Sequence, residues 1–319
     1  MSVILDRDPY PTYKYQICLD EVGRGCLFGD AYIACVILPK EPTPFDGTNI
    51  KDSKKFSSKK KLKQVAEYIK ENALYYHVCP INAADIDKLN ILKAVMKGMH
   101  ICITSVFEEI NKKESITYND CIAVVDGNYF TPYVKYDEQT DTFDEMPHVT
   151  IEKGDGKIMG IAAASILAKD ARDSYISELC DTYPILDERY NLRKNVGYAT
   201  TAHREGIQSH GICQWHRKTF GICKESTSYV IETNTTNEDE DEDEDTDVCE
   251  TCQETVDMDY MTLCERCDKS QCDDCGGDGG DWGENEVWVC NECLPQCLEC
   301  ENTLRCAGDE CCGKGRTDK

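Results

Sequence analysis

The segment DEVGRG, residues 20–25, constrains this chain more than any other, because two adjacent acids end an apolar run and a Gly-Arg-Gly turn follows them. Neighbouring carboxylates repel each other unless a cation lies between them. The glycines let the backbone itself approach a ligand closely. The segment therefore indicates a site for a divalent metal ion and a polyanion, although an acidic surface turn would use the same residue types.

The charge of the chain is unevenly distributed. Residues 232–319 contribute −22 of the formal net charge of −25, which leaves only −3 for residues 1–231. Eight consecutive acids at 238–245 cannot bury apolar surface and predict a disordered acidic linker over residues 231–248. The linker separates a predicted catalytic domain, residues 1–230, from a cysteine-rich domain, residues 249–319. The sequence has no apolar run of membrane-spanning length and no signal-peptide pattern.

The order of strand and helix patterns predicts an α/β fold. Short apolar runs predict strands at residues 15–20, 31–38, 74–81 and 121–127. Apolar residues at helical spacing predict one helix capped by Ser57 or Ser58, a second over about 82–109, and a third over 158–179. The polar stretch over about 134–146 predicts a loop.

Acids recur at strand ends or tight turns: Asp20 with Glu21, then Asp126, then Asp155. Four converging carboxylates would hold one or two Mg²⁺ or Mn²⁺ ions, which suit phosphodiester hydrolysis. The ordered segments resemble ribonuclease HII over about residues 14–224. They are DEVGRG, GDAYIACVIL, KDSKKFS, DIDKLNILKAVMKGM, VVDGN, KGDGKIMGIAAASILAKDARD and NVGYATTAHREGIQSHGICQWHRKTF.

The resemblance implies a ribonuclease H-like mixed sheet flanked by helices, in a monomeric catalytic domain. It implies an endonuclease that cuts the RNA strand of RNA–DNA hybrids, and cuts 5′ of single ribonucleotides in duplex DNA. The products would have 5′-phosphate and 3′-hydroxyl ends, and the role would be ribonucleotide excision repair and primer removal in DNA replication. The implied catalytic and metal-binding residues are Asp20, Glu21, Asp126 and Asp155.

The resemblance also implies residues that bind the substrate. Gly23, Arg24 and Gly25 would read the ribose 2′-hydroxyl, the group that distinguishes RNA from DNA. Tyr198 would stack on the sugar of the following deoxynucleotide, the alternative being a tyrosine that covers the core. The candidate phosphate contacts are Lys54, Ser165 and Lys169, of which the last two lie four residues apart on one helix face.

Two departures and two rival interpretations accompany the resemblance. The family usually has proline where this chain has Cys26 and Asp30, which predicts a looser turn and a more negative local field. A metal-free mechanism would pair His203 with His210 or His216 as general acid and base. A catalytically inactive fold that only recruits hybrids is the other rival, and the presence of all four acids argues against it.

The C-terminal cysteines form four Cys-x-x-Cys pairs, which suit two tetrahedral Zn²⁺ ions. The predicted ligands are Cys249, Cys252, Cys264, Cys267, Cys272, Cys275, Cys290 and Cys293. Only four residues separate the second and third pairs, so we expect pairs one and three on one ion and pairs two and four on the other. The spacing is similar to a plant-homeodomain-type zinc finger, with FYVE-like and RING-like fingers as alternatives. Four of the five cysteines over 297–312 are candidates for a third zinc.

A finger this acidic should avoid DNA phosphates and favour a basic protein partner, such as a histone-like tail. A zinc-stapled protein-interaction module is the simplest interpretation, and a ubiquitin-ligase-like role is an alternative. The nine scattered cysteines over 18–223 predict a reducing intracellular compartment, with cytoplasm and nucleus both open.

Overall fold

The computed structural model describes residues 5–137 and 141–232, together with the backbone of four short strands further along. The chain divides into two compact units, Met1–Glu232 and Thr233–Lys319. In the second unit β8 pairs with β9 and β10 pairs with β11, both antiparallel. These strands are Thr246–Val248 (β8), Thr255–Asp257 (β9), Met261–Leu263 (β10) and Ser270–Cys272 (β11). Cys272 lies in β11, and the other predicted zinc ligands lie outside the described residues.

The first unit is built on a mixed sheet of five strands in the order β3-β2-β1-β4-β7. They are Tyr15–Val22 (β1), Ala31–Ile37 (β2), Tyr75–Ile81 (β3), Cys121–Asp126 (β4) and His148–Ile151 (β7). The first three strands pair antiparallel, whereas β1 with β4 and β4 with β7 pair parallel. Parallel pairing places the carboxyl ends of β1 and β4 at the same edge of the sheet.

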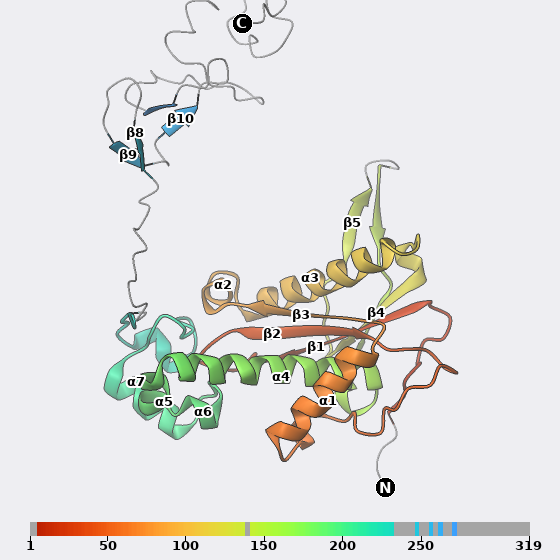
Figure 1. Ribbon diagram of the computed structural model, residues 1–319, viewed down its shortest axis with the longest axis horizontal. Helices are drawn as coiled ribbons and strands as arrows, with labels where there is room; N and C mark the ends of the chain where they lie inside the picture. The colour runs from red at the N-terminus through yellow and green to blue at the C-terminus, as the bar shows by residue number, and fades with distance from the viewer. Residues whose placement is uncertain are drawn as a thin grey trace, which may run out of the picture. The chain divides into compact units, whose positions relative to one another are not determined.

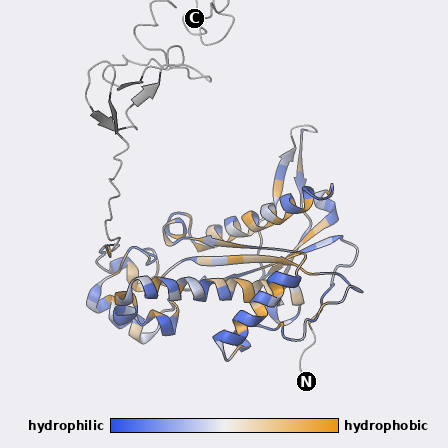
Figure 2. Ribbon diagram, viewed as in Figure 1, coloured by the Kyte–Doolittle hydropathy of each residue, from blue (hydrophilic) through white to orange (hydrophobic). Residues whose placement is uncertain are grey.

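Helices cover both faces of this sheet (Figure 1). The helix α3 (Ile91–Asn111) packs on one face, and α1 (Lys59–Asn72) and α4 (Met159–Thr182) pack on the other. Strand β2 alternates accordingly: Ile33 and Cys35 join the core under α3, while Ala34 and Val36 join the core under α4. Figure 2 shows the apolar residues gathered along the central strands and the hydrophilic ones on the outer sides of the helices.

A helical cluster follows the end of α4 and has its own core. Its members are α5 (Pro184–Tyr190), α6 (Leu192–Asn195) and α7 (Thr201–His210). Short 3₁₀ turns connect the larger elements of the unit: η1 (Ser53–Lys55), η2 (Tyr118–Asp120), η3 (Gly154–Gly156) and η4 (Gly221–Glu225). Among the described residues no helix is both long enough and apolar enough to span a bilayer.

The single helix predicted over 82–109 is wrong, because Asn90 divides it into α2 (Ala83–Leu89) and α3. Asn90 has a φ of 68°, and its side chain accepts a hydrogen bond from the backbone N–H of Lys93. Asparagine tolerates positive φ and caps helices well, so one residue both ends the first helix and starts the second. Ser58 is the residue before α1, but its side chain makes no capping hydrogen bond.

The loop predicted over 134–146 is also wrong. It contains an antiparallel pair, β5 (Val134–Asp137) and β6 (Thr142–Glu145), which projects from the sheet in Figure 1. Tyr136 faces Phe143 across the pair, with ring centroids 5.3 Å apart. The polar residues between these aromatics hid the alternating pattern that marks a strand.

Candidate active site

The sheet register brings the predicted acids together at one edge. Leu19 pairs with Val125 in the parallel β1–β4 ladder, so Asp20 and Asp126 are the next residues on neighbouring strands. Asp126 in turn pairs with Ile151 at the end of β7, from which the chain continues into η3 and Asp155. Strand topology, and not proximity in sequence, therefore places these carboxylates at one end of the sheet.

Asp20 is buried against α4. Its neighbour Leu19 belongs to the core under α3, so the alternation of the strand directs Asp20 to the opposite face, where Ser165 lies. Burial raises the pKa of Asp20 well above its ordinary value; the charges of Glu21 and Asp126 raise it further, and a hydrogen bond from Ser165 opposes the rise. The site therefore disfavours a negative charge on Asp20 when no cation is bound.

Asp126 and Asp155 are connected through the backbone of η3. The N–H of Gly154 donates to Oδ1 of Asp126 at 2.6 Å, which fixes the orientation of that carboxylate. Burial raises the pKa of Asp126, the Gly154 hydrogen bond lowers it, and the charge of Asp155 raises it again, with a net rise. Lys54 reaches the same site from η1, with Nζ 3.5 Å from Oδ2 of Asp155.

Glu21 faces the turn that follows β1. Its Oε1 lies 3.5 Å from Nη1 of Arg24, an exposed guanidinium of the DEVGRG segment. Burial raises the pKa of Glu21, Arg24 lowers it, and the charge of Asp126 raises it, with a net rise. Two cations of the chain, Arg24 and Lys54, thus already approach the acidic cluster.

The donor set suits a hard divalent cation. Asp20, Glu21, Asp126 and Asp155 offer carboxylate oxygens, which Mg²⁺ and Mn²⁺ prefer. Burial and mutual repulsion raise the pKa of three of them, and a cation would relieve that repulsion. Within residues 5–137 and 141–232, however, no three His, Cys, Asp or Glu side chains already have a metal-ligand arrangement. The chemistry of the donors fits a metal, and the four side chains would have to rearrange to complete the ligand set.

The Gly-Arg-Gly turn is packed against a buried arginine. Gly23 has a φ of +90°, and a Cβ there would lie 2.3 Å from Nε of Arg172. A Cβ on Gly25 would meet nothing within 4 Å. Gly23 therefore serves the fold, whereas Gly25 leaves open space beside the acids, which is where a ligand would need to approach.

Arg172 connects this turn to the segment that precedes Tyr198. The arginine is fully buried and donates to the backbone carbonyls of Asp30, Phe28 and Val196 at 3.1, 3.0 and 2.6 Å. A second buried arginine, Arg217, donates to Gly29 and Arg24 at 3.0 and 3.1 Å. Four backbone carbonyls of the turn, those of Arg24, Phe28, Gly29 and Asp30, thus accept hydrogen bonds from these two arginines, which hold the turn in place without the two prolines usual in the family.

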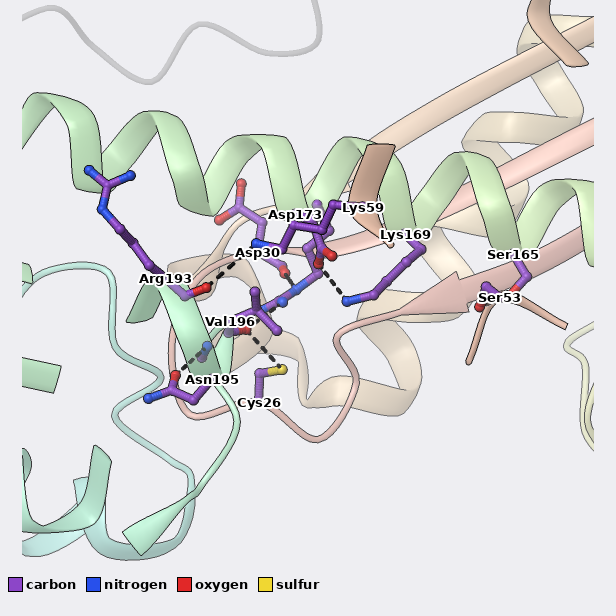
Figure 3. Close-up of polar contacts among 12 residues, drawn as sticks. Cys26, Asp30, Ser53, Lys59, Ser165, Lys169, Asp173, Arg193, Asn195 and Val196 are labelled. Atoms are coloured by element: carbon purple, nitrogen blue, oxygen red, sulfur yellow. Dashed lines mark hydrogen bonds and ion pairs between the residues drawn. The ribbon is translucent and has the colours of Figure 1, made fainter. Parts of the chain in front are cut away.

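Tyr198 lies at the surface beside this clamp. Its side chain is 43% exposed, and the guanidinium carbon of Arg172 lies 6.0 Å from its ring centroid. Cys26, which interacts with Tyr198, is buried, with Sγ 3.8 Å from the carbonyl of Val196 (Figure 3). The ring is thus partly exposed and not part of the buried core, so it is available for stacking.

The model of the ribonuclease HII family matches residues 17–223. The chain belongs to the ribonuclease HII family. Its curated relatives include ribonuclease HII of Parabacteroides distasonis, 40% identical over 68% of this chain and 96% of the relative. Ribonuclease HII of Bacteroides thetaiotaomicron is 37% identical over 64% of this chain and 88% of the relative. The catalytic unit is therefore an endonuclease, an endoribonuclease that acts on RNA–DNA hybrids.

Solved structures also resemble the chain. The ribonuclease HII in a complex with PCNA from Archaeoglobus fulgidus is 24% identical, with a TM-score of 0.45 over 65% of this chain and 96% of that one. Ribonuclease H2 of Pyrococcus horikoshii is 17% identical, with a TM-score of 0.47 over 66% and 96%.

The predicted phosphate contacts of the ribonuclease HII unit differ in exposure. Lys54 has an 83% exposed side chain, whereas Lys169 forms an ion pair with Asp173 at 2.5 Å. Ser165 is buried, and its hydroxyl lies 2.9 Å from that of Ser53 (Figure 3). Ser165 also forms a side-chain hydrogen bond with Asp20, so a phosphate contact by its hydroxyl stays a prediction.

The histidines of the ribonuclease HII unit do not form an acid–base pair at the acids. His203 and His216 are buried together, with their Nε2 atoms 3.2 Å apart. Burial, with the charge of His203 second, lowers the pKa of His216 to about 3. A buried, neutral histidine cannot donate a proton to a leaving group near pH 7. His210 is exposed at the end of α7, so the metal-free rival lacks its two partners.

Acid should destabilise the folded unit through this histidine pair. His216 binds protons in the unfolded chain near pH 6.5 but in the folded chain only near pH 3, so its contribution to stability is complete above pH 6.5 and falls as the pH decreases. Between pH 6.5 and 5.0 the loss should be about 2 kcal/mol. In His216→Asn, an amide oxygen still accepts from the N–H of Cys213, and this part of the pH dependence should disappear. Denaturant unfolding at pH 6.5 and 5.0 measures this loss in both proteins. An equal loss of unfolding free energy in the parent and in His216→Asn would contradict the prediction.

Replacing Arg172 should loosen the ribonuclease HII turn. In Arg172→Lys the ammonium cannot reach three carbonyls in a fork, so buried acceptors lose their donors and the free energy of unfolding should fall by about 2–4 kcal/mol. Arg204 is exposed on α7, and Arg204→Lys should change it by less than about 0.5 kcal/mol. Thermal melting compares the two variants, and similar melting temperatures would show that Arg172 is not a clamp.

Proposed function

We propose that the chain cuts the RNA strand of RNA–DNA hybrids and cuts duplex DNA immediately 5′ of a single ribonucleotide, leaving 5′-phosphate and 3′-hydroxyl ends. The main support is that Asp20 and Glu21, at the end of β1, run directly into the Gly-Arg-Gly turn while the register sets Asp126 beside them. The turn that would read the ribose is thus next in sequence to the acids that would hydrolyse its phosphate.

A divalent cation, Mg²⁺ or Mn²⁺, would be held by Asp20, Glu21, Asp126 and Asp155. When bound it would supply an activated water and neutralise the charge that develops on the phosphate. Backbone hydrogen bonds orient two of these acids before a cation binds. The N–H of Gly154 donates to Asp126, and the N–H of Glu21 donates to Oδ1 of Asp20 at 2.7 Å. Lys54, beside Asp155, would contact a phosphate oxygen.

Recognition of the ribonucleotide would come from the turn and Tyr198. Gly23, Arg24 and Gly25 would read the 2′-hydroxyl, and the open space at Gly25 supports close approach of a sugar to the backbone. Tyr198 would stack on the next deoxyribose and so favour a junction between RNA and DNA. Lys169, held by Asp173, would contact a phosphate once that ion pair opens.

The physiological role we propose is ribonucleotide excision repair and removal of replication primers.

For the tail we propose two zinc ions on the four Cys-x-x-Cys pairs and a protein-interaction role with a basic, histone-like partner. The spacing of the cysteines and the acidity of residues 232–319 support this proposal. A reducing intracellular compartment is consistent with nine free, buried cysteines in the first unit.

A substrate panel tests the proposed function. The intact chain, loaded with zinc, is incubated with Mg²⁺ or Mn²⁺ and four labelled 30-base-pair duplexes: all DNA, DNA with one ribonucleotide, an RNA–DNA hybrid, and all RNA. We expect cleavage of the second and third duplexes and none of the first and fourth. Cleavage of the all-RNA duplex at a similar rate would rule out reading of an RNA–DNA substrate, and no cleavage of any duplex would favour a binding role.

A further inference from the structure

Seven lysines gather between residues 51 and 63, a segment with a single acid, Asp52. We call them the lysine ridge: Lys51, Lys54, Lys55, Lys59, Lys60, Lys61 and Lys63. All seven are exposed. Because residues 1–231 have a net charge of only −3, this segment concentrates positive charge that the rest of the unit lacks. Such segregation creates a local positive field despite the negative total.

The fold does not use the outer part of the ridge. Leu62, Ala66 and Ile69 form the buried side of α1 and pack with the alanine-rich part of α4. Lys60, Lys61 and Lys63 lie outside that buried side, and within residues 5–137 and 141–232 they form no ion pair with an acid. These three neighbouring ammonium groups repel one another in the free protein, although the charges of Glu67 and Asp170 act on Lys63 from a distance.

The inner end of the ridge lies at the proposed catalytic acids. Lys54 is 3.5 Å from Asp155, and Lys55 is 3.8 Å from Asp52. From there α1 begins at Lys59, whose Nζ lies 3.5 Å from the backbone carbonyl of Arg193 in α6. The positive surface therefore starts where the scissile phosphate would be and continues away from it.

The ridge is also hollowed. A depression of about 400 Å³ lies beside α1, and its lining includes two lysines, Lys51 and Lys61, one acid, Asp46, and the rings of Phe56 and Tyr68. Lys51 lies over the ring of Phe56, 4.8 Å from its centroid. Cationic groups around a concave surface suit a phosphate chain better than a flat protein partner.

We propose that the lysine ridge binds the phosphate backbone of the duplex that flanks the cleavage site, as a second contact area outside the catalytic acids and the Gly-Arg-Gly turn. This inference rests on the proposed nucleic-acid substrate. The ridge contributes affinity without reading sequence, because ammonium groups contact phosphates and not base edges. Binding through it releases counterions, so it should appear in the salt dependence of the dissociation constant.

The experiment measures that salt dependence. The full chain with Asp126→Asn binds a fluorescent 30-base-pair DNA duplex containing one ribonucleotide, in Mg²⁺, between 50 and 200 mM KCl. Into it we introduce Lys60→Gln, Lys61→Gln and Lys63→Gln together. The matched control replaces Lys88, Lys93 and Lys112 by glutamine, three exposed lysines of α2, α3 and the residue after α3, which cover the other face of the sheet. Both variants lose the same formal charge.

Three phosphate contacts should account for a slope of about 2 to 3 in the logarithm of the dissociation constant against the logarithm of salt. The ridge variant should lose this slope, so its affinity should fall about 40-fold less between 50 and 200 mM salt than that of the parent. The control should keep the parent slope. Equal slopes in the two variants would overturn the proposal. An equal loss would reflect net charge alone, and two unchanged slopes would mean that the ridge makes no phosphate contacts.

Two further measurements keep the outcomes distinct. If the triple variant melts well below its parent, the single substitution Lys61→Gln should still reduce the slope by about 1. Cleavage by the same proteins with Asp126 restored separates the two claims. If the ridge variant loses salt dependence but the intact chain cleaves nothing, phosphate binding by the ridge stands and the nuclease activity is rejected. If the intact chain cleaves normally and the ridge variant keeps the parent salt dependence, phosphate binding by the ridge is rejected.

Discussion

Asp126→Asn should abolish cleavage while leaving the fold intact. The amide oxygen can still accept the hydrogen bond from Gly154, so the backbone of η3 should keep its position. The carboxylate charge is lost, however, and with it several kcal/mol of stabilisation that a bound cation would give the transition state. The rate on a single-ribonucleotide duplex should fall by about 1,000-fold or more.

The control for this variant is Asp144→Asn, an exposed acid in the projecting strand β6, which should cleave at the parent rate. The melting temperature of metal-free Asp126→Asn should equal or exceed that of the parent, since one of the mutually repelling charges is removed. A rate within about 10-fold of the parent would contradict a role for Asp126 in catalysis.

Gly23→Ala and Gly25→Ala should separate stability from recognition. At Gly23 the new Cβ would overlap Arg172, with 2.3 Å to Nε and 2.7 Å to Cδ, and the φ of +90° adds backbone strain. We expect a loss of about 2–4 kcal/mol in the free energy of unfolding and a large loss of activity. At Gly25 the Cβ meets nothing within 4 Å, so the fold should be unaffected.

The methyl group at Gly25 would nevertheless occupy the space where a sugar must approach. Gly25→Ala should therefore lower kcat/KM for a single-ribonucleotide duplex by about 100-fold, equivalent to about 2.7 kcal/mol. Its melting temperature should stay within about 1 °C of the parent. Thermal melting and steady-state kinetics on both variants check the pair, and unchanged kinetics for Gly25→Ala would remove the turn from substrate recognition.

Sequence patterns predicted the parts of the fold that local chemistry decides. The apolar runs that became β1, β2 and β4 and the alanine-rich α4 were predicted close to their observed bounds. The break at Asn90 was missed because a helical stripe continues across it, and only the positive φ of that residue reveals it. The β5–β6 hairpin was missed because one cross-strand aromatic pair is a weak signal among polar residues.

The acids of the candidate site were predictable from the sequence, but the buried residues that hold the neighbouring turn and orient the acids were not. Asp20, Glu21 and Asp126 follow apolar strands, which sequence reports directly. Arg172 and Arg217 gave no such signal, because a charged residue is usually exposed and nothing local says that backbone carbonyls will surround it. The burial of Ser165 was likewise hidden, since its helix position alone could not show that η1 would cover it.

The chemistry of the cut ends tests the central claim most directly. The intact chain is incubated in Mg²⁺ with a DNA duplex that contains one ribonucleotide, and the fragments are mapped and their termini identified by mass spectrometry. Attack by water should give a cut immediately 5′ of the ribonucleotide, with a 3′-hydroxyl on the DNA fragment and a 5′-phosphate on the ribonucleotide. A cut 3′ of the ribonucleotide with a 2′,3′-cyclic phosphate would show attack by the 2′-oxygen and contradict the account.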